Sequence, residues 1–355
     1  MPATGNDHAS ASWTIRVNGT ALGDDAARDL VRLRVEEDLD AVAMLEIELR
    51  NWDAATLRHT WSDSPRLAVG ARVEAVFDEA RPGAAPMFVG EITGIEPVWS
   101  RDRAPRLTVR AYDLLHRLSR STVTRAFVEA TDSEIAAKVA REFGLKARVA
   151  RTEARHKHVL QSNQTGLDFL RSRARRNGFE LFARAEELHF RAPAVRVPAA
   201  HTLRVGQEIE ELAVRLSAAG QAGATSVRAW SQPDKREIVA AGAAAVVPTM
   251  GGRTVGPRRA DQAFGKSTVT TATVPVRTAV EARALAVGRL TSSALAYVEA
   301  DGEGPGLPTL RTGTTLAIEG AGDAFSGTYY VVQVTHTLTE DNQFRTAYRL
   351  GRTAT

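Results

Sequence analysis

Two histidines separated by one residue come closest to a metal site in this sequence. His156 and His158 flank Lys157, and residues two apart lie on one face of a β-strand. Zinc sites need three or four ligands, whereas this pair supplies two, and the cations of Arg155 and Lys157 repel a metal ion. We therefore expect no metal here. His336, on a terminal strand, is expected to be a packed or hydrogen-bonded core histidine and not a base.

Adjacent acidic residues are the next candidates for chemistry. Neighbouring residues on a strand point to opposite faces, so such carboxylates cannot act on one substrate as acid and base. The HExxH, GxSxG and Walker-type phosphate-loop motifs are absent, and the glycines of 320–327 favour a β-turn over a phosphate cradle. The adjacent pairs are Glu36 with Glu37, Glu186 with Glu187, and Glu210 with Glu211.

The composition narrows the chemistry further. The 355 residues include no cysteine, which excludes disulfides, thiolate metal sites and cysteine nucleophiles. We therefore predict no catalytic, cofactor-binding or metal residues, no cofactor, and no enzymatic activity.

Positive charge is concentrated in one segment of a chain whose net charge is only +4. Between Lys138 and Arg191 there are 13 Lys and Arg against 6 Asp and Glu. Such a segment can contact nucleic acid or an acidic partner. Single-strand binders interleave aromatic platforms with the charge, and these are missing. We favour a solvated arginine-rich surface and expect no nucleic acid partner.

The first residues, 1–13, lack a basic region followed by an apolar run, so we expect a short arm and no signal peptide. No apolar stretch is long enough to cross a bilayer. The expected site of synthesis is the bacterial cytoplasm. With 43% hydrophobic residues, the chain can bury a core and is long enough for two or more domains.

The first third predicts antiparallel strands. Apolar and polar residues alternate repeatedly, with turns at Asn18-Gly19 and Arg81-Pro82-Gly83, and this pattern is typical of a small antiparallel barrel or sandwich. The expected strands are Trp13–Val17, Val31–Val35, Leu45–Leu49, Val69–Phe77, Phe88–Glu96 and Leu107–Tyr112.

The pattern then changes to that of an α+β unit. Thr131-x-x-Glu134 is a capping box that opens a helix ending at Gly144. A second helix is expected from Thr165, with Asp168 at its third position, to Asn177-Gly178. A hairpin, Phe179–Phe182 with Leu188–Phe190, closes the unit.

The rest of the chain returns to strands around one inserted segment. Strands are expected at Leu203–Leu216, Ser226–Trp230, Thr314–Ile318, Tyr329–Val334 and Phe344–Leu350. Residues 240–265, rich in Ala, Gly and Pro, predict a loop. Thr278-x-x-Glu281 predicts a third capping box and helix.

The last strands resemble the end of the first barrel. Leu67-Ala-Val-Gly70 parallels Leu310-Arg-Thr-Gly313, and Phe88-Val-Gly90 parallels Phe325-Ser-Gly327. The segment Leu107–Tyr112 parallels Phe344–Tyr348. Two copies of one barrel in a chain would let three chains present six equivalent barrels in a ring.

These residues resemble a known family. The segment from Gln161 through Asp168-Phe169-Leu170 to Phe179 is similar to the middle-domain signature of phage late control protein D and related contractile tail baseplate hubs. Tyr112–Leu115 and Ile135 to Leu145 resemble the family upstream. The downstream matches are Trp230–Lys235, taken as the end of a strand in the second barrel, Leu310–Gly313 and Phe325–His336.

The resemblance implies a fold that is mainly β with α+β insertions: two tube-like antiparallel β-barrels plus two smaller inserted units. The expected boundaries are 1–118 for the first barrel, 119–195 for the α+β middle domain, 196–240 and 305–355 for the second barrel, and 241–304 for an inserted loop and helix unit.

The implied function is that of a structural hub of a contractile injection system or phage tail baseplate, the counterpart of the hub half of valine-glycine repeat proteins. Such a hub is a homotrimer with a pseudo-sixfold ring, a symmetry adaptor between a hexameric inner tube and a trimeric spike. Because the sequence stops at Thr355, after the closing strand, the spike is expected to be a separate protein. Other baseplate proteins are further possible partners.

The implied location is a phage-tail-like particle, released on lysis in some systems. The alternative left open is a tail-tip module that binds glycan or nucleic acid, or a component of a cell-wall hydrolase. It predicts saccharide or oligonucleotide binding by residues 119–195.

Overall fold

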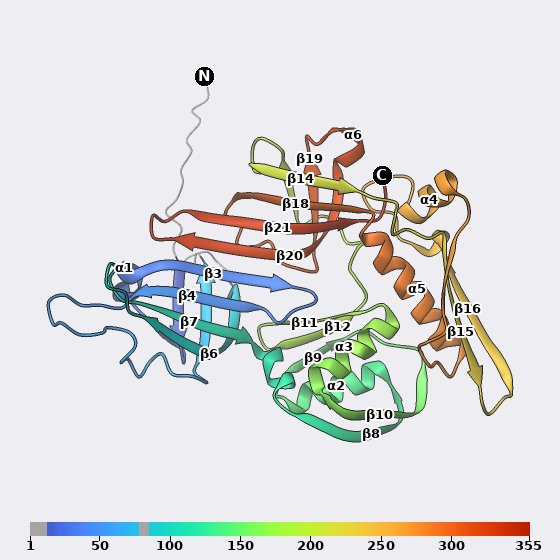
Figure 1. The fold of residues 1–355 in the computed structure, drawn as a ribbon, viewed down its shortest axis with the longest axis horizontal. Helices are drawn as coiled ribbons and strands as arrows, with labels where there is room; N and C mark the ends of the chain where they lie inside the picture. Colours follow the sequence, from blue (N-terminus) through green and yellow to red (C-terminus); the bar gives the residue numbers. More distant parts are fainter. Residues whose placement is uncertain (1–12, 78–84) are drawn as a thin grey trace.

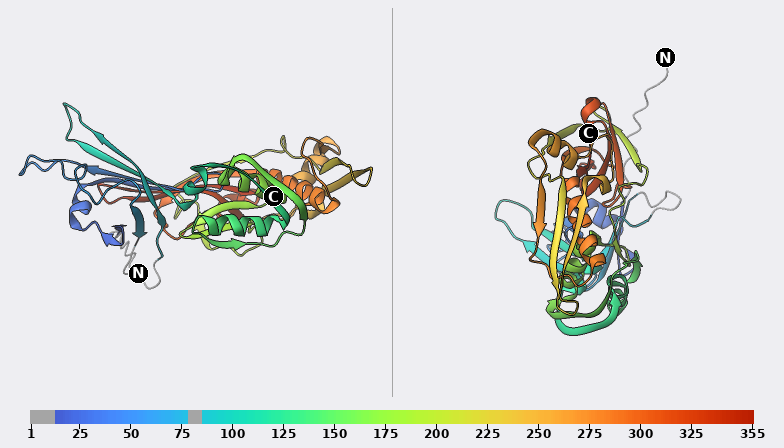
Figure 2. Two further views of the ribbon diagram at one scale, coloured as in Figure 1. Left: turned by 90° about the horizontal axis from the view of Figure 1, so that it is seen from below. Right: turned by 90° about the vertical axis from the view of Figure 1, so that its right-hand side faces the viewer.

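The computed structural model describes residues 13–77 and 85–355. The fold is mainly β: one large curled sheet of 13 strands, three small sheets and a few helices. Figures 1 and 2 show an elongated molecule, with the large sheet along one side and the inserted units beside it. The expected fold class, mainly β with α+β insertions, is confirmed. The N-terminal arm (1–12) and the turn expected at Arg81–Gly83 lie outside the described residues.

The first part of the large sheet, which we call the first half-sheet, is formed by the six strands expected from alternation and one short strand. Its inward side chains pack into one core that includes Ile15, Val35, Ile47 and Val109. Its elements are β1 (Trp13–Val17), β2 (Thr20–Ala21), α1 (Asp24–Asp29), β3 (Leu30–Asp38), β4 (Met44–Arg50), β5 (Arg72–Phe77), β6 (Phe88–Val98), β7 (Arg106–Asp113) and η1 (Leu114–Ser119).

The second half-sheet comes mainly from the end of the chain. Its core includes Ile318, Tyr329 and Leu350. Its elements are β13 (His201–Arg204), β14 (Glu211–Leu216), β18 (Val298–Pro305), β19 (Thr315–Glu319), α6 (Gly322–Phe325), β20 (Gly327–Thr339) and β21 (Phe344–Arg352).

One pairing, which we call the joint, makes these two half-sheets continuous. β20 pairs antiparallel with β3, from Gln333 opposite Asp38 to Thr339 opposite Arg32. Residues nearly 300 positions apart in the chain therefore lie on neighbouring strands, as Figure 1 shows for the red and blue strands. The sequence predicted two barrels but gave no sign of their shared sheet.

The middle unit packs two helices against two small sheets. The predicted capping box at Thr131 is present, Thr165 caps the second helix, and Gly178 ends it in the left-handed conformation. The expected hairpin is also present. The elements are β8 (Thr122–Thr131), α2 (Asp132–Glu142), β9 (Lys146–Val149), β10 (Arg155–Thr165), α3 (Gly166–Asn177), β11 (Glu180–Arg184) and β12 (Glu187–Arg191).

The second insertion differs from the expected boundaries. Residues 224–240, assigned to the second barrel, form a separate three-stranded sheet, whereas β18 belongs to the large sheet. Alternation in a strand does not specify which sheet it joins. The elements of this insertion are β15 (Ala224–Ser231), β16 (Arg236–Ala243), η2 (Ala244–Val246), α4 (Gly256–Phe264), β17 (Thr268–Thr271) and α5 (Ala279–Leu295).

Two local predictions in this insertion need correction. The segment 240–265 is not all loop, because α4 forms with a proline in its first turn, where the missing N–H costs nothing. At α5, Thr278 accepts from Glu281 as expected, but the carboxylate of Glu281 accepts from the backbone N–H of Arg277 and not of Thr278.

The two insertions meet at a contact between glycines. A Cβ placed on Gly178, at the end of α3, would lie 2.3 Å from the Cα of Gly288 in α5, and a Cβ on Gly288 would lie 2.5 Å from the Cα of Gly178. The backbones of the two insertions therefore touch without an intervening side chain.

Candidate functional site: a duplicated sheet with two free edges

The two half-sheets repeat one strand order. In the first, the hydrogen-bonded order is β3–β4–β7–β6–β5, and in the second it is β14–β18–β21–β20–β19. Every neighbouring pair in both series is antiparallel. The series differ at the end, where β1 pairs antiparallel with β5 but β13 pairs parallel with β19. The internal repeat is thus a repeat of sheet topology.

The repeat extends to individual hydrogen bonds. β6 and β7 have a bulge after Ile92, and β20 and β21 have one after Val331. Gly70 donates to Ile92 at 2.7 Å, and Gly313 donates to Val331 at 2.9 Å. Both glycines have positive φ, 89° and 71°, a conformation that glycine adopts without strain. Ile92 and Val331 are therefore equivalent positions.

This equivalence tests the parallels drawn from the sequence. The first, Leu67–Gly70 with Leu310–Gly313, is confirmed. The other two are out of register, because the bulge alignment places Phe88 with Gly327, and Leu107 with Thr346. Aromatic residues shared by two meanders misled the comparison.

One face of the large sheet carries a ladder of ion pairs across strands. Glu46 on β4 lies 2.7 Å from Arg32 on β3 and 2.9 Å from Arg110 on β7. Arg110 in turn lies 2.8 Å from Glu96 on β6. The second half-sheet has three such pairs on β18: Asp301 with Arg349, Glu303 with Arg345, and Glu299 with Arg215. The opposite face holds the apolar core, so this charged face is the one presented to solvent.

A buried ion pair secures the joint. The carboxylate of Glu37 on β3 accepts from Arg311, from the backbone N–H of Thr312 at 3.2 Å and from its hydroxyl at 3.3 Å. Burial alone would raise the pKa of Glu37, but the Arg311 guanidinium outweighs it and lowers that pKa. Glu36, on the other face, accepts from Gln333 across the joint at 2.9 Å. Glu36 and Glu37 therefore lie on opposite faces of the sheet, as expected for neighbours on a strand.

Each half-sheet ends in an edge without a partner strand among residues 13–77 and 85–355. In the first, residues 94–98 of β6 pair with β7 on one side only, since β5 pairs only with Phe88–Glu91. In the second, β14 pairs only with β18. An exposed edge of this kind is a template for another strand.

The two predicted histidines do not form a pair. His156 is buried, with its Nε2 2.8 Å from Arg173 and 3.3 Å from Asp132, whereas His158 is exposed. Burial alone would raise the pKa of Asp132, but hydrogen bonds from His156 and Arg173 hold it at about 2. No group of three possible metal ligands occurs in the described part of the chain.

His336 is confirmed as a core residue. Its Nδ1 lies 3.0 Å from the Thr346 hydroxyl and its Nε2 3.1 Å from the carbonyl oxygen of Leu310. Burial lowers the pKa of His336 to about 4.

Three of the remaining candidate carboxylates, and several arginines of the middle unit, are held in ion pairs. Glu186 pairs with Arg72 at 2.8 Å, and Glu187 pairs with Arg148 at 2.7 Å. Glu210 pairs with Arg345. In the basic middle unit, Arg125, Arg148, Arg155 and Arg173 each have a carboxylate partner.

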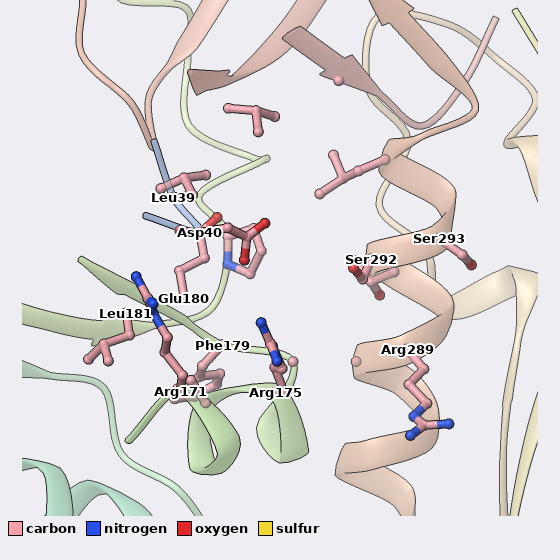
Figure 3. A pocket seen from close by; sticks show the side chains of 18 of the residues that line it. Leu39, Asp40, Arg171, Arg175, Phe179, Glu180, Leu181, Arg289, Ser292 and Ser293 are labelled. Atoms are coloured by element: carbon pink, nitrogen blue, oxygen red, sulfur yellow. The ribbon is translucent and has the colours of Figure 1, made fainter. Parts of the chain in front are cut away.

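A cleft of about 1090 Å³ lies between the middle unit, α5 and the second half-sheet. In Figure 3, Asp40, Glu180, Arg171 and Arg175 lie on one wall, and Arg289, Ser292 and Ser293 of α5 lie on the other. The Tyr330 hydroxyl donates to both oxygens of Glu180 at 2.7 Å. Burial raises the pKa of Glu180 to about 7. This cleft could not be predicted from the sequence, because distant segments form it.

Glu180→Gln is expected to change the pH dependence of stability. The pKa of Glu180 is higher in the folded than in the unfolded state. The stability that comes from protonated Glu180 is therefore fully present below the unfolded pKa near 4.5 and is lost as pH rises through about 7. The wild type should lose roughly 1–3 kcal/mol over this window, and the variant less. Urea unfolding at pH 5 and pH 8 measures the difference, and an unchanged pH dependence in the variant would contradict it.

One protein-family model matches most of the chain. The family model described as Alg8 N-terminal domain matches residues 7–340. The chain belongs to this family. No curated protein matches the chain. No helix in residues 13–77 and 85–355 has the length and apolar character to cross a membrane.

Solved structures share the fold of this Alg8 N-terminal domain family member. The 43 kDa tail protein of prophage MuSo2 from Shewanella oneidensis has a TM-score of 0.72 at 13% identity, over 96% of this chain and 98% of that one. A tail protein from Neisseria meningitidis MC58 has a TM-score of 0.69 at 16% identity, over 96% of each chain.

A third similar structure comes from a secretion system. The E. coli c3393 protein, a type VI secretion component described as similar to T4 tail proteins gp27 and gp5, has a TM-score of 0.59 at 14% identity, over 97% of this chain and 77% of that one. At these identities the likeness shows the fold. The expected resemblance to contractile tail baseplate hubs is confirmed at this level.

Proposed function

We propose that the chain is a structural hub of a contractile injection system or phage tail baseplate. Three copies form a ring of six similar half-sheets, which adapts a hexameric inner tube to a trimeric spike. The observation that carries the proposal is the duplication of one strand order and one hydrogen-bond register within a chain. Three duplicated chains match a sixfold partner on one side and a threefold partner on the other.

Several features support a mechanical role. The ladder of ion pairs gives the ring a hydrated charged face, and the joint fixes the two half-sheets of each chain at one angle. The buried histidines and paired carboxylates hold the fold together, and we propose no enzymatic activity or cofactor. The four-unit organisation is part of the proposal, with residues 224–295 as the second insertion.

The partners are an inner tube protein, a spike carried on a separate polypeptide, and other baseplate proteins. The fold shared with phage tail and type VI secretion proteins supports this environment. The chain is made in the bacterial cytoplasm and then assembled into the particle.

The stoichiometry of the complex tests the proposal. The full chain is co-expressed with the inner tube and spike proteins of its particle, and the mass of the purified complex is measured by native mass spectrometry. We expect three copies of the hub with three of the spike. A hub that remains monomeric with both partners would contradict the proposal.

A further inference from the structure

We infer that the free edge of β14 in one copy pairs antiparallel with the free edge of β6 in the next, with Glu96 opposite Arg215 and Val98 opposite Ala213. The inference rests on the proposed ring and deepens it by fixing the strands, their direction and their register.

The joint within the chain is the template for this contact. By the bulge equivalence, Gln333–Thr339 of β20 corresponds to Gly94–Ser100 of β6 and its following residues. By the pairings of β4 with β3 and of β18 with β14, Arg32–Asp38 corresponds to Glu211–Ser217. At the joint, Gln333–Thr339 of β20 pairs with Arg32–Asp38 of β3. A ring of equivalent half-sheets therefore pairs β6 of one copy with β14 of another.

The exposure of equivalent residues supports this pairing. Trp99 is 60% exposed, whereas its counterpart Leu338, covered at the joint, is 1% exposed. Ile95 is also more exposed than its counterpart Val334, which is fully buried. The free edge of β6 thus carries an apolar face that a neighbouring strand covers in the second half-sheet.

A second pair of residues points to the same contact. At the joint, Glu37 bonds Thr312, and they are 7% and 4% exposed. Their counterparts are both apolar: Leu216, on the free edge of β14, is 43% exposed, and Val69, in the turn before β5, is 67% exposed. Where the joint has a polar contact, these counterparts are two apolar residues. Their exposure to water is relieved only if Leu216 of one copy packs against Val69 of the next.

The charges continue the ladder across the contact. Glu96 already pairs with Arg110, and Arg215 lies 3.9 Å from Glu299. Placing Glu96 opposite Arg215 alternates the signs without a break from one copy to the next, and opposite charges on directly facing residues stabilise antiparallel pairs.

Backbone directions select the pairs suited to a chemical test. Thr339 donates to Gln343 in its own hairpin, so alternation points the N–H groups of Leu338, His336 and Val334 toward β3. The equivalent residues on β6 include Pro97, which lacks the donor, so the proposed contact has one ladder hydrogen bond fewer than the joint. Val98 and Ala213 then form a non-hydrogen-bonded pair, with Cα atoms about 4.5 Å apart.

Disulfide trapping tests the register, because the chain has no cysteine of its own. The full-length double variant Val98→Cys with Ala213→Cys is oxidised in the complex with tube and spike. We expect linked dimers and trimers on non-reducing gels, since a disulfide needs Cα atoms roughly 4.4–6.8 Å apart. The variant Val98→Cys with Arg215→Cys, one pair out of register, should link at least about tenfold less, because diagonal residues lie about 7–8 Å apart.

The joint supplies a positive control within one chain. Thr337 and Arg34 are the counterparts of Val98 and Ala213 and face each other at the joint, so Thr337→Cys with Arg34→Cys should link intramolecularly. If the control links and native mass spectrometry gives a trimer, but Val98→Cys with Ala213→Cys does not link, the register is overturned and the ring survives. If the unmodified hub stays monomeric with its partners, both fail.

Discussion

Arg173→Met is expected to lower the free energy of unfolding by about 3–5 kcal/mol, because it leaves a buried carboxylate without its cation. Arg173 donates through Nε to Asp132 at 2.5 Å, and both side chains are almost fully buried. Asp132 retains the Asn177 amide at 2.7 Å and His156, which cannot replace the guanidinium. The loss would fall on the middle unit, where α2, α3 and β10 meet.

Urea unfolding of Arg173→Met measures this effect, with Arg155→Met as the matched control. Arg155 also joins β10 to α2, through Glu134 at 2.8 Å, but both side chains are about half exposed. Exposed pairs contribute roughly 0–1 kcal/mol, so the control should be nearly neutral. If both variants lost the same free energy of unfolding, the buried network would contribute no more to stability than an exposed ion pair.

The same network has a pH signature. The folded-state pKa of Asp132 is depressed to about 2, so its contribution is complete above the unfolded pKa near 4 and is lost as pH falls toward 2. The difference in stability between the wild type and Arg173→Met should therefore shrink below about pH 4.

Arg311→Met is expected to weaken the joint, with a loss of about 3 kcal/mol in the free energy of unfolding. It leaves Glu37 buried with only the Thr312 hydroxyl and backbone N–H as donors. Because the joint connects the half-sheets, we also expect faster proteolysis in the connecting segments. Urea denaturation and limited proteolysis of the full chain measure the two effects.

The double variant Glu37→Leu with Arg311→Met separates a broken pair from a lost side chain. Leucine occupies the equivalent position at Leu216, and apolar residues that replace both partners of a buried ion pair are often neutral or better. We expect the double variant to recover most of the loss. A double variant less stable than Arg311→Met would mean that the joint depends on the Glu37 carboxylate itself.

The sequence predicted the elements well because local rules govern them. Alternation located β1, β3, β4, β5, β6 and β7, and caps located α2 and α3. The Leu-x-x-Gly repeat was found because a positive-φ glycine is required at Gly70 and Gly313. These signals reside in a few neighbouring residues, so one chain is enough to detect them.

The joint, the cleft and the membership of β15 and β16 could not be predicted in this way. Each depends on which strand lies beside which, and period-two alternation is the same whatever the partner. The different burial of His156 and His158 could not be predicted for a related reason: both lie on β10, but the nearby Asp132 and Arg173 bury only the first. The residues that mark the proposed contact, Leu216 and Val69, became informative only beside Glu37 and Thr312.

The glycine contact between α3 and α5 bears on how a load would travel through the molecule. Side chains between packed helices can change rotamer and absorb a displacement, but no side chain lies between Gly178 and Gly288. A push on one insertion reaches the other directly, backbone against backbone. The two insertions are therefore expected to move together as one rigid unit beside the sheet. A methyl group at either glycine would force their backbones apart.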